Sequence, residues 1–166
     1  MIVEEFVSDC RSQTVKRVLL VVLRVYLGVI FLVSSWGKLT GDGDFATRLA
    51  GFVSRNIADE RTHGFYAGFL ESVVLPNAAV FAAFVMWGEF LCGLALVTGT
   101  ATRLAAGVAM FMVLNFMFLK GHWFWMSSSN DAAFFLIGLV LVLGAAGRAF
   151  GVDYYRARKW PRAGIW

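Results

Sequence analysis

Long apolar runs dominate the pattern of hydrophobic and polar positions along this 166-residue chain. Four of them approach the roughly 20 residues that a helix needs to cross a hydrocarbon layer about 30 Å thick. They cover residues 18–39, 77–97, 101–119 and 132–150. Because a chain in lipid must satisfy its own backbone hydrogen bonds, these runs are predicted to be helices. We therefore expect an all-α membrane protein with a single domain, built as a bundle of four transmembrane helices.

The segment between the first two runs is too long to be a simple turn. Asp44 can accept the first free backbone N–H groups of a helix. The apolar positions that follow recur at helical spacing: Phe45, Leu49, Phe52, Val53 and Ile57. We predict a short helix that lies on, or dips into, the outer membrane interface. Such a helix could simply cap the bundle, or it could serve as a lid that handles a substrate.

Composition supports the membrane interpretation. Hydrophobic residues make up 59% of the chain and charged residues 16%, and the mean hydropathy is +0.70. A soluble domain has about 45–50% apolar and about 25% charged residues. The net charge is +4, but the basic residues gather towards the chain ends. This placement indicates membrane topology, and we expect no nucleic-acid partner.

Lysine and arginine are more frequent on the cytoplasmic side of membrane proteins. With four spans, one side of the membrane carries nine of them: Arg11, Lys16, Arg17, Arg103, Arg148, Arg156, Arg158, Lys159 and Arg162. The other side carries five: Lys38, Arg48, Arg55, Arg61 and Lys120. Both terminal tails are therefore predicted to lie in the cytoplasm.

Arg24 is a charge inside the first apolar run, and it needs a partner. A charge at mid-membrane costs about 2.5–3.5 kcal/mol on insertion scales. Counted from the expected cytoplasmic ends, Arg24 is about 9 Å deep and Glu89 about 12 Å deep at 1.5 Å per residue. We therefore predict an intramembrane ion pair between Arg24 and Glu89. The pair could fix the register of two helices, or it could be a proton or substrate site.

A second polar group is expected near the outer surface, at the ends of the spans. It comprises Lys38, Asn115, Lys120, His122 and Asp131, and it could hold the polar head of a ligand such as a quinone. Each of these residues also has a structural interpretation as an interfacial anchor, a helix cap or an interhelical hydrogen bond. No metal site is predicted, because the two histidines have too few further ligands and the two cysteines form no CxxC pair.

Three stretches carry a family resemblance: LRVYLGVIFLVSSWGKLTG, GEFLCGLALVTGTATRLAA and NDAAFFLIGLVLVLGAAGRAFGVD. Over roughly residues 19–153 the chain resembles the DoxX family of small bacterial membrane proteins. The resemblance implies a four-helix protein of the bacterial inner membrane. The matching positions are Arg24, Gly28, Gly37 or Lys38, Glu89, Gly93, Gly99, Thr102, Arg103, Asp131, Gly147, Arg148 and Asp153.

Two functions are expected with equal weight: the first follows from the resemblance, and the second from the aromatic segment KGHWFWMSSSN, the basic tail KWPRAGIW and the small size of the chain. The first is a membrane subunit of a quinone-linked respiratory oxidoreductase; no flavin, haem or iron–sulfur motif is present, so we expect no intrinsic cofactor and electrons supplied by a partner. The second is a non-catalytic accessory subunit that packs on and stabilises a larger membrane complex. A small transporter is a less favoured third interpretation. Membrane lipids, some of them tightly bound, and other membrane protein subunits are the expected partners.

Overall fold

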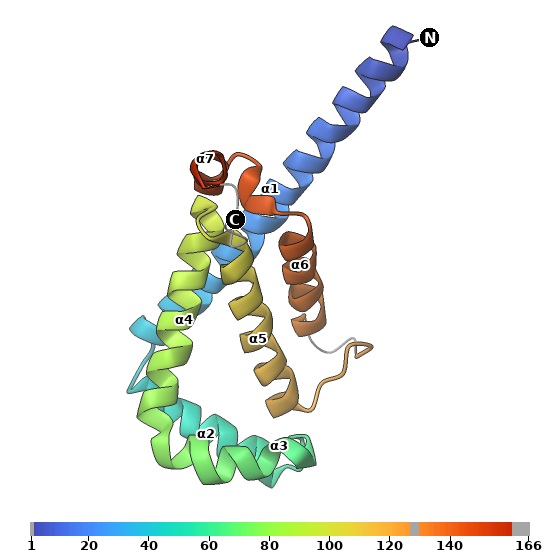
Figure 1. Cartoon of the computed structure of the whole chain (residues 1–166). Helices are drawn as coiled ribbons and strands as arrows, with labels where there is room; N and C mark the ends of the chain where they lie inside the picture. Colours follow the sequence, from blue (N-terminus) through green and yellow to red (C-terminus); the bar gives the residue numbers. More distant parts are fainter. Residues whose placement is uncertain (1, 127–129, 161–166) are drawn as a thin grey trace.

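The bundle consists of four helices that each run beside two neighbours (Figure 1). The computed structural model describes the backbone of residues 2–126 and 130–160, and the side chains of residues 12–126 and 130–160. Helix α1 packs on α4 and α6, and α5 also packs on α4 and α6. The described residues contain helices and no strand, so the all-α prediction is confirmed. The four helices are α1 (Ile2–Thr40), α4 (Ala78–Thr98), α5 (Thr102–Lys120) and α6 (Asp131–Leu143).

Short helices close the two ends of the bundle (Figure 1). One end holds α2 and α3 and the turns that lead into α4, and the other end holds η3 and α7. Their bounds are α2 (Phe45–Ala58), α3 (Gly64–Phe69), the π-helical turn η1 (Leu70–Val74), the 3-10 turns η2 (Leu75–Asn77) and η3 (Ala146–Arg148), and α7 (Val152–Lys159).

Helix α2 is the predicted loop helix, and it begins as expected. Asp44 Oδ2 accepts the backbone N–H of Thr47 at 3.1 Å and so caps the first turn. The apolar face of α2 packs into a buried cluster at this end of the bundle. The cluster comprises Leu49, Val53, Leu70, Val74, Ala82 and Leu119. Burial of this face holds α2 across the end of the bundle, where it forms one wall of the candidate site.

Within the described residues, three helical segments are long and apolar enough to cross a membrane: Ser12–Thr40, Gly64–Thr98 and Thr102–Lys120. The predicted fourth run differs from expectation, because α6 ends at Leu143 after 13 residues instead of continuing to residue 150. Ala145 then adopts a left-handed backbone conformation with φ 47°, which stops the helix. The backbone oxygens of Ala146 and Ala149, which lie beyond this break, bind Arg24.

Helices α1 and α4 approach most closely at two glycines. A Cβ on Gly93 would lie 2.8 Å from the backbone oxygen of Gly28, and a Cβ on Gly28 would lie 3.0 Å from the backbone oxygen of Gly93. Small residues permit such close packing between helices in lipid. This contact fixes the register of α1 against α4.

Replacing Gly93 with alanine should therefore lower the free energy of unfolding by about 1–3 kcal/mol, the usual cost of overpacking. The measurement is unfolding in mixed detergent micelles, followed by circular dichroism. Gly107→Ala is the matched control, since a Cβ there meets nothing within 4 Å. An equal loss in both variants would show that helix contact is not the cause.

Candidate functional site

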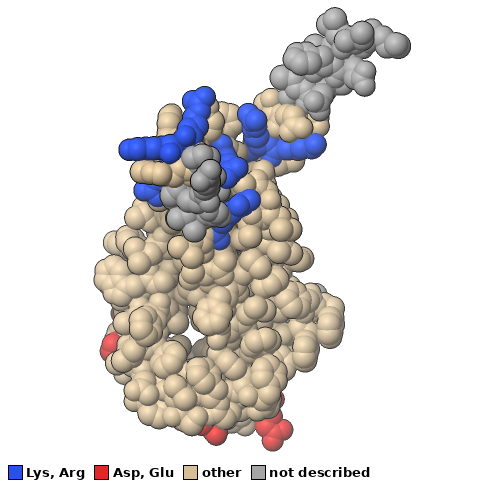
Figure 2. Space-filling view, viewed as in Figure 1, with Lys and Arg blue, Asp and Glu red and all other residues tan. Residues whose placement is uncertain are grey.

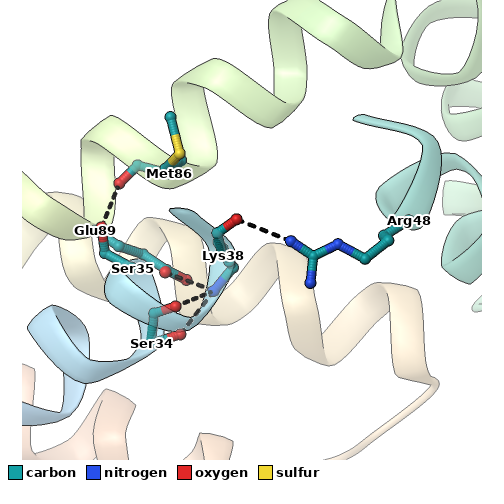
Figure 3. Close-up of polar contacts among 6 residues, drawn as sticks. All are labelled: Ser34, Ser35, Lys38, Arg48, Met86 and Glu89. Carbon is teal, nitrogen blue, oxygen red and sulfur yellow. Dashed lines mark hydrogen bonds and ion pairs between the residues drawn. The ribbon is translucent and has the colours of Figure 1, made fainter. Parts of the chain in front are cut away.

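Lys38 and Glu89 form a buried ion pair between α1 and α4 (Figure 3). Lys38 Nζ lies 2.6 Å from Glu89 Oε2, and Glu89 is only 3% exposed. The same ammonium group donates to the Ser34 hydroxyl at 2.6 Å. Charges taken out of water are tolerated only when opposite charges and further hydrogen bonds compensate their desolvation. The pair therefore holds a fixed carboxylate in the interior of the bundle.

Arg48 joins this pair to the covering helix α2. Its guanidinium group donates to the backbone oxygen of Lys38 at 2.8 Å (Figure 3). The same group lies 5.6 Å from the ring centre of Phe45. The first contact ties α2 to the last turn of α1. It also brings a third charged side chain close to Lys38 and Glu89.

A second ion pair connects the end of α5 to the start of α6. Lys120 Nζ lies 2.9 Å from Asp131 Oδ2, and His122 Nδ1 lies 3.5 Å from the same oxygen. Lys120 is in the last turn of α5 and Asp131 in the first turn of α6. Each charge is thus favoured by the dipole of its own helix.

Both ion pairs line one cavity of about 460 Å³. Its wall includes four basic side chains, Lys38, Arg48, Arg55 and Lys120, and two acidic ones, Glu89 and Asp131. Aromatic and aliphatic residues of α1, α2, α5 and α6 complete the wall. The excess of hydrogen-bond donors suits a ligand with carbonyl or anionic oxygens.

An apolar cavity, also of about 460 Å³, adjoins the charged one, and Leu49 and Phe116 line both. The space-filling view of Figure 2 shows the molecule hollowed here, at the position that lies between α4 and α5 on the side of α2 in Figure 1. Tyr66 and Asn115 supply polar atoms to the lining of the apolar cavity, where Tyr66 donates to Asn115 Oδ1 at 2.5 Å. Together the two cavities offer a charged compartment beside an apolar one.

The structure brings together three of the five residues predicted for the outer polar group. Lys38, Lys120 and Asp131 line the charged cavity. His122 contacts Asp131 without lining that cavity, and Asn115 belongs to the apolar one. Sequence reasoning did not include Arg48 or Arg55 in this group, and it assigned Glu89 to a different partner.

The predicted Arg24–Glu89 ion pair is corrected by the structure. Glu89 pairs with Lys38, while Arg24 donates to the backbone oxygens of Ala146 at 3.0 Å and Ala149 at 3.2 Å. Arg24 also contacts the chain beside Gly99, since a Cβ there would lie 2.5 Å from its guanidinium group. Glu89 is ten residues from Gly99 along α4, which separates the two charges by roughly 15 Å at 1.5 Å per residue.

The error has a physical source. The prediction assumed that Val18, where the first apolar run starts, and Val97, where the second ends, lie at the same depth in the membrane. Helix α1 in fact begins at Ile2 and extends beyond the end of α4 (Figure 1). The contact between Gly28 and Gly93 fixes a different register, and alignment of such small residues is the signal that could have revealed it.

Asp153 supplies the negative charge near Arg24. Its side chain, which is fully buried, accepts the backbone N–H groups of Ala101 at 2.7 Å and Thr102 at 2.8 Å. It therefore caps the start of α5, where a negative charge is favoured by the helix dipole. The Arg24 and Asp153 contacts join α1, α5 and the C-terminal segment at the end of the bundle opposite the cavities.

These features define a small helical membrane protein with buried charges at both ends of its bundle. Within that class the chain belongs to the DoxX family, because the DoxX family model matches residues 19–123. The match includes Lys38, Glu89 and Lys120, whereas Asp131 and Asp153 lie beyond it. No curated protein and no solved structure matches the chain.

Proposed function

We propose that this DoxX-family protein is a membrane subunit of a quinone-linked respiratory oxidoreductase and binds a quinone in the two adjoining cavities. The observation that carries the proposal is the shared lining by Leu49 and Phe116, with charged side chains on one side and apolar ones on the other. A quinone needs the same two environments: donors for its carbonyl oxygens, and an apolar space for its tail.

In this proposal the basic side chains Lys38, Arg48 and Lys120 donate hydrogen bonds to the quinone oxygens. Glu89 and Asp131 are the carboxylates that can exchange protons with the bound headgroup. The sequence has no motif for a flavin, haem or iron–sulfur centre, so a partner subunit supplies the electrons. The chain then contributes the binding site and the proton-exchanging groups.

The proposed location is a bacterial inner membrane, with both terminal tails in the cytoplasm. On the face in Figure 2, lysine and arginine gather at the end of the molecule that carries α7, and acidic residues lie at the other end. This asymmetry agrees with the positive-inside rule. Helix α6 and the residues after it form the fourth crossing, and α2 lies at the outer interface. Of the basic residues counted for this topology, Arg11 and Arg162 lie outside the described side chains.

Quinone content provides the test. The protein is purified in mild detergent from its native membrane, and bound quinone and phospholipid are extracted and quantified. Gly88→Leu fills the apolar cavity, and we expect it to lower the retained quinone at least fivefold. Arg48→Gln removes a donor from the charged cavity, and we expect a similar loss.

Each variant has a matched control. Gly107→Leu makes the same exchange on an outward face of α5, and Arg61→Gln removes an exposed charge that pairs with Asp59. Both controls should retain quinone at the level of the wild type. A preparation whose cavities carry phospholipid in place of quinone would contradict the proposal, as would equal losses in variants and controls.

An accessory role is the second candidate, and the aromatic segment after α5 favours it. The rings of Trp123 and Trp125 stack with centres 5.4 Å apart, and Trp125 is 79% exposed. Exposed tryptophans are frequent at the centres of protein interfaces. If Trp125→Ala releases a co-purifying subunit while Arg48→Gln leaves both quinone content and turnover unchanged, the accessory role would replace the quinone-binding one.

A further inference from the structure

A separate hollow lies at the basic end of the bundle, away from the two cavities of the proposed quinone site. Its volume is about 360 Å³, and it forms where α1, the segment after α6 and α7 meet. Three exposed arginines line it, one from each of these elements: Arg17, Arg148 and Arg158. Residues far apart in the sequence therefore converge to place three positive charges around one space.

Among the described side chains, these three arginines have no acidic partner. In the described part of the chain, no carboxylate lies within ion-pair distance of Arg17, Arg148 or Arg158. The Arg158 guanidinium lies 5.1 Å from the ring centre of Tyr154, which also lines the hollow. Converging arginines without acidic partners favour an anionic ligand, and guanidinium groups match phosphate oxygens in geometry.

The floor of the hollow is apolar. Leu20 and Gly144 lie in contact there, since a Cβ on Gly144 would be 2.8 Å from the Leu20 side chain. Three alanines continue this surface: Ala145, Ala149 and Ala157. An inorganic anion would gain nothing from contact with such an apolar surface. The glycerol and the first acyl carbons of a lipid would be stabilised there by burial of their apolar surface.

The hollow lies at the end of the bundle that the proposed topology assigns to the cytoplasmic headgroup layer. Arg17 precedes the buried Arg24 by seven residues, so it lies about 10 Å nearer the end of the bundle at 1.5 Å per residue. Basic pockets between helices on the cytoplasmic side are suited to the headgroups of anionic lipids. The hollow thus combines charge, an apolar floor and the appropriate depth.

We propose that this basic hollow binds the phosphate headgroup of an anionic phospholipid. The three arginines hold the phosphate oxygens, and Leu20 with the neighbouring alanines contacts the start of the acyl chains. A lipid bound there would connect α1 to the C-terminal helix α7.

The experiment is native mass spectrometry of the purified full-length chain titrated with phosphatidylglycerol, cardiolipin or phosphatidylcholine. We expect the two anionic lipids to bind at least tenfold more tightly than phosphatidylcholine. Arg148→Gln with Arg158→Gln should remove most of this preference. Ala157→Trp should also weaken anionic lipid binding, because it fills the hollow without changing the net charge.

The control is Lys16→Gln with Lys159→Gln, which removes the same charge at the same end but from residues that do not line the hollow. It should leave anionic lipid affinity within twofold of the wild type. Equal losses in the two double variants, or no loss in Ala157→Trp, would overturn the site. Displacement of the lipid by millimolar inorganic phosphate would reassign the arginines to a free anion and also overturn the proposal.

Discussion

Replacing Asp153 with asparagine should lower the free energy of unfolding by about 3 kcal/mol, the upper cost of leaving a buried hydrogen-bond donor unsatisfied near a charged group. Arg24 would lose the negative charge that acts on it. The new amide group would also face the backbone N–H of Thr102, which now donates to Asp153 at 2.8 Å. The amide N–H of the new side chain and the backbone N–H of Thr102 would then face each other without an acceptor between them. The measurement is unfolding in mixed detergent micelles at neutral pH.

Asp42→Asn is the control for this change, because Asp42 is exposed in the loop before α2. It should alter stability by less than about 0.5 kcal/mol, as is usual for surface substitutions. If Asp153→Asn behaves like this control, Asp153 does not compensate Arg24. The Arg24 guanidinium would then depend on the backbone oxygens of Ala146 and Ala149 alone.

The same contacts explain why the end of α6 could not be predicted from the apolar pattern. In a continuous helix, the backbone N–H of Asp153 would donate to the oxygen of Ala149. It donates instead to Gly99 at 2.9 Å, and the oxygen of Ala149 is left for Arg24. A hydrophobic run from 132 to 150 contains no sign of this exchange. Arg24, which binds the backbone oxygens beyond the break, lies more than a hundred positions away in the sequence.

Local signals were sufficient elsewhere in the fold. Helices α4 and α5 end at Thr98 and Lys120, close to the predicted limits, because each is followed by a glycine in the left-handed conformation. Helix α2 begins after Asp44 as predicted, because the cap and the apolar spacing lie within one turn of each other. Such features depend on neighbours in the sequence, so the sequence alone reveals them.

Most of the charged residues of the candidate site could be predicted from the sequence, but the ion pairs that they form could not. Charges are rare within the apolar runs and directly at their ends, so Lys38, Glu89, Lys120 and Asp131 could be selected as unusual. Which charges form pairs depends on the register between helices. Comparing the depths of Arg24 and Glu89, each counted from the end of its own apolar run, predicted the wrong pair. The contribution of α2 was also hidden, because Arg48 lies off the apolar face that defines that helix in the sequence.

The pairing of Lys38 with Glu89 leads to the second large expected effect. Lys38→Met alone should lower the free energy of unfolding by about 3–5 kcal/mol, because it leaves the buried charge of Glu89 without its partner. Glu89→Leu alone should cost less, because the Lys38 that it leaves unpaired is only partly buried. The double variant removes both charges and should recover most of that loss. The measurement is a double-mutant cycle of unfolding in mixed detergent micelles.

Quinone content of the same variants separates a structural role from a functional one. If the ion pair only fixes the register of α1 and α4, the double variant should recover both stability and bound quinone. If the charges hold the ligand, stability should return while quinone remains lost, and this is the outcome we expect. The exposed Arg61–Asp59 pair is the control cycle, with a coupling of about 0–1 kcal/mol. Additive losses at Lys38 and Glu89 would show that the two side chains do not depend on each other.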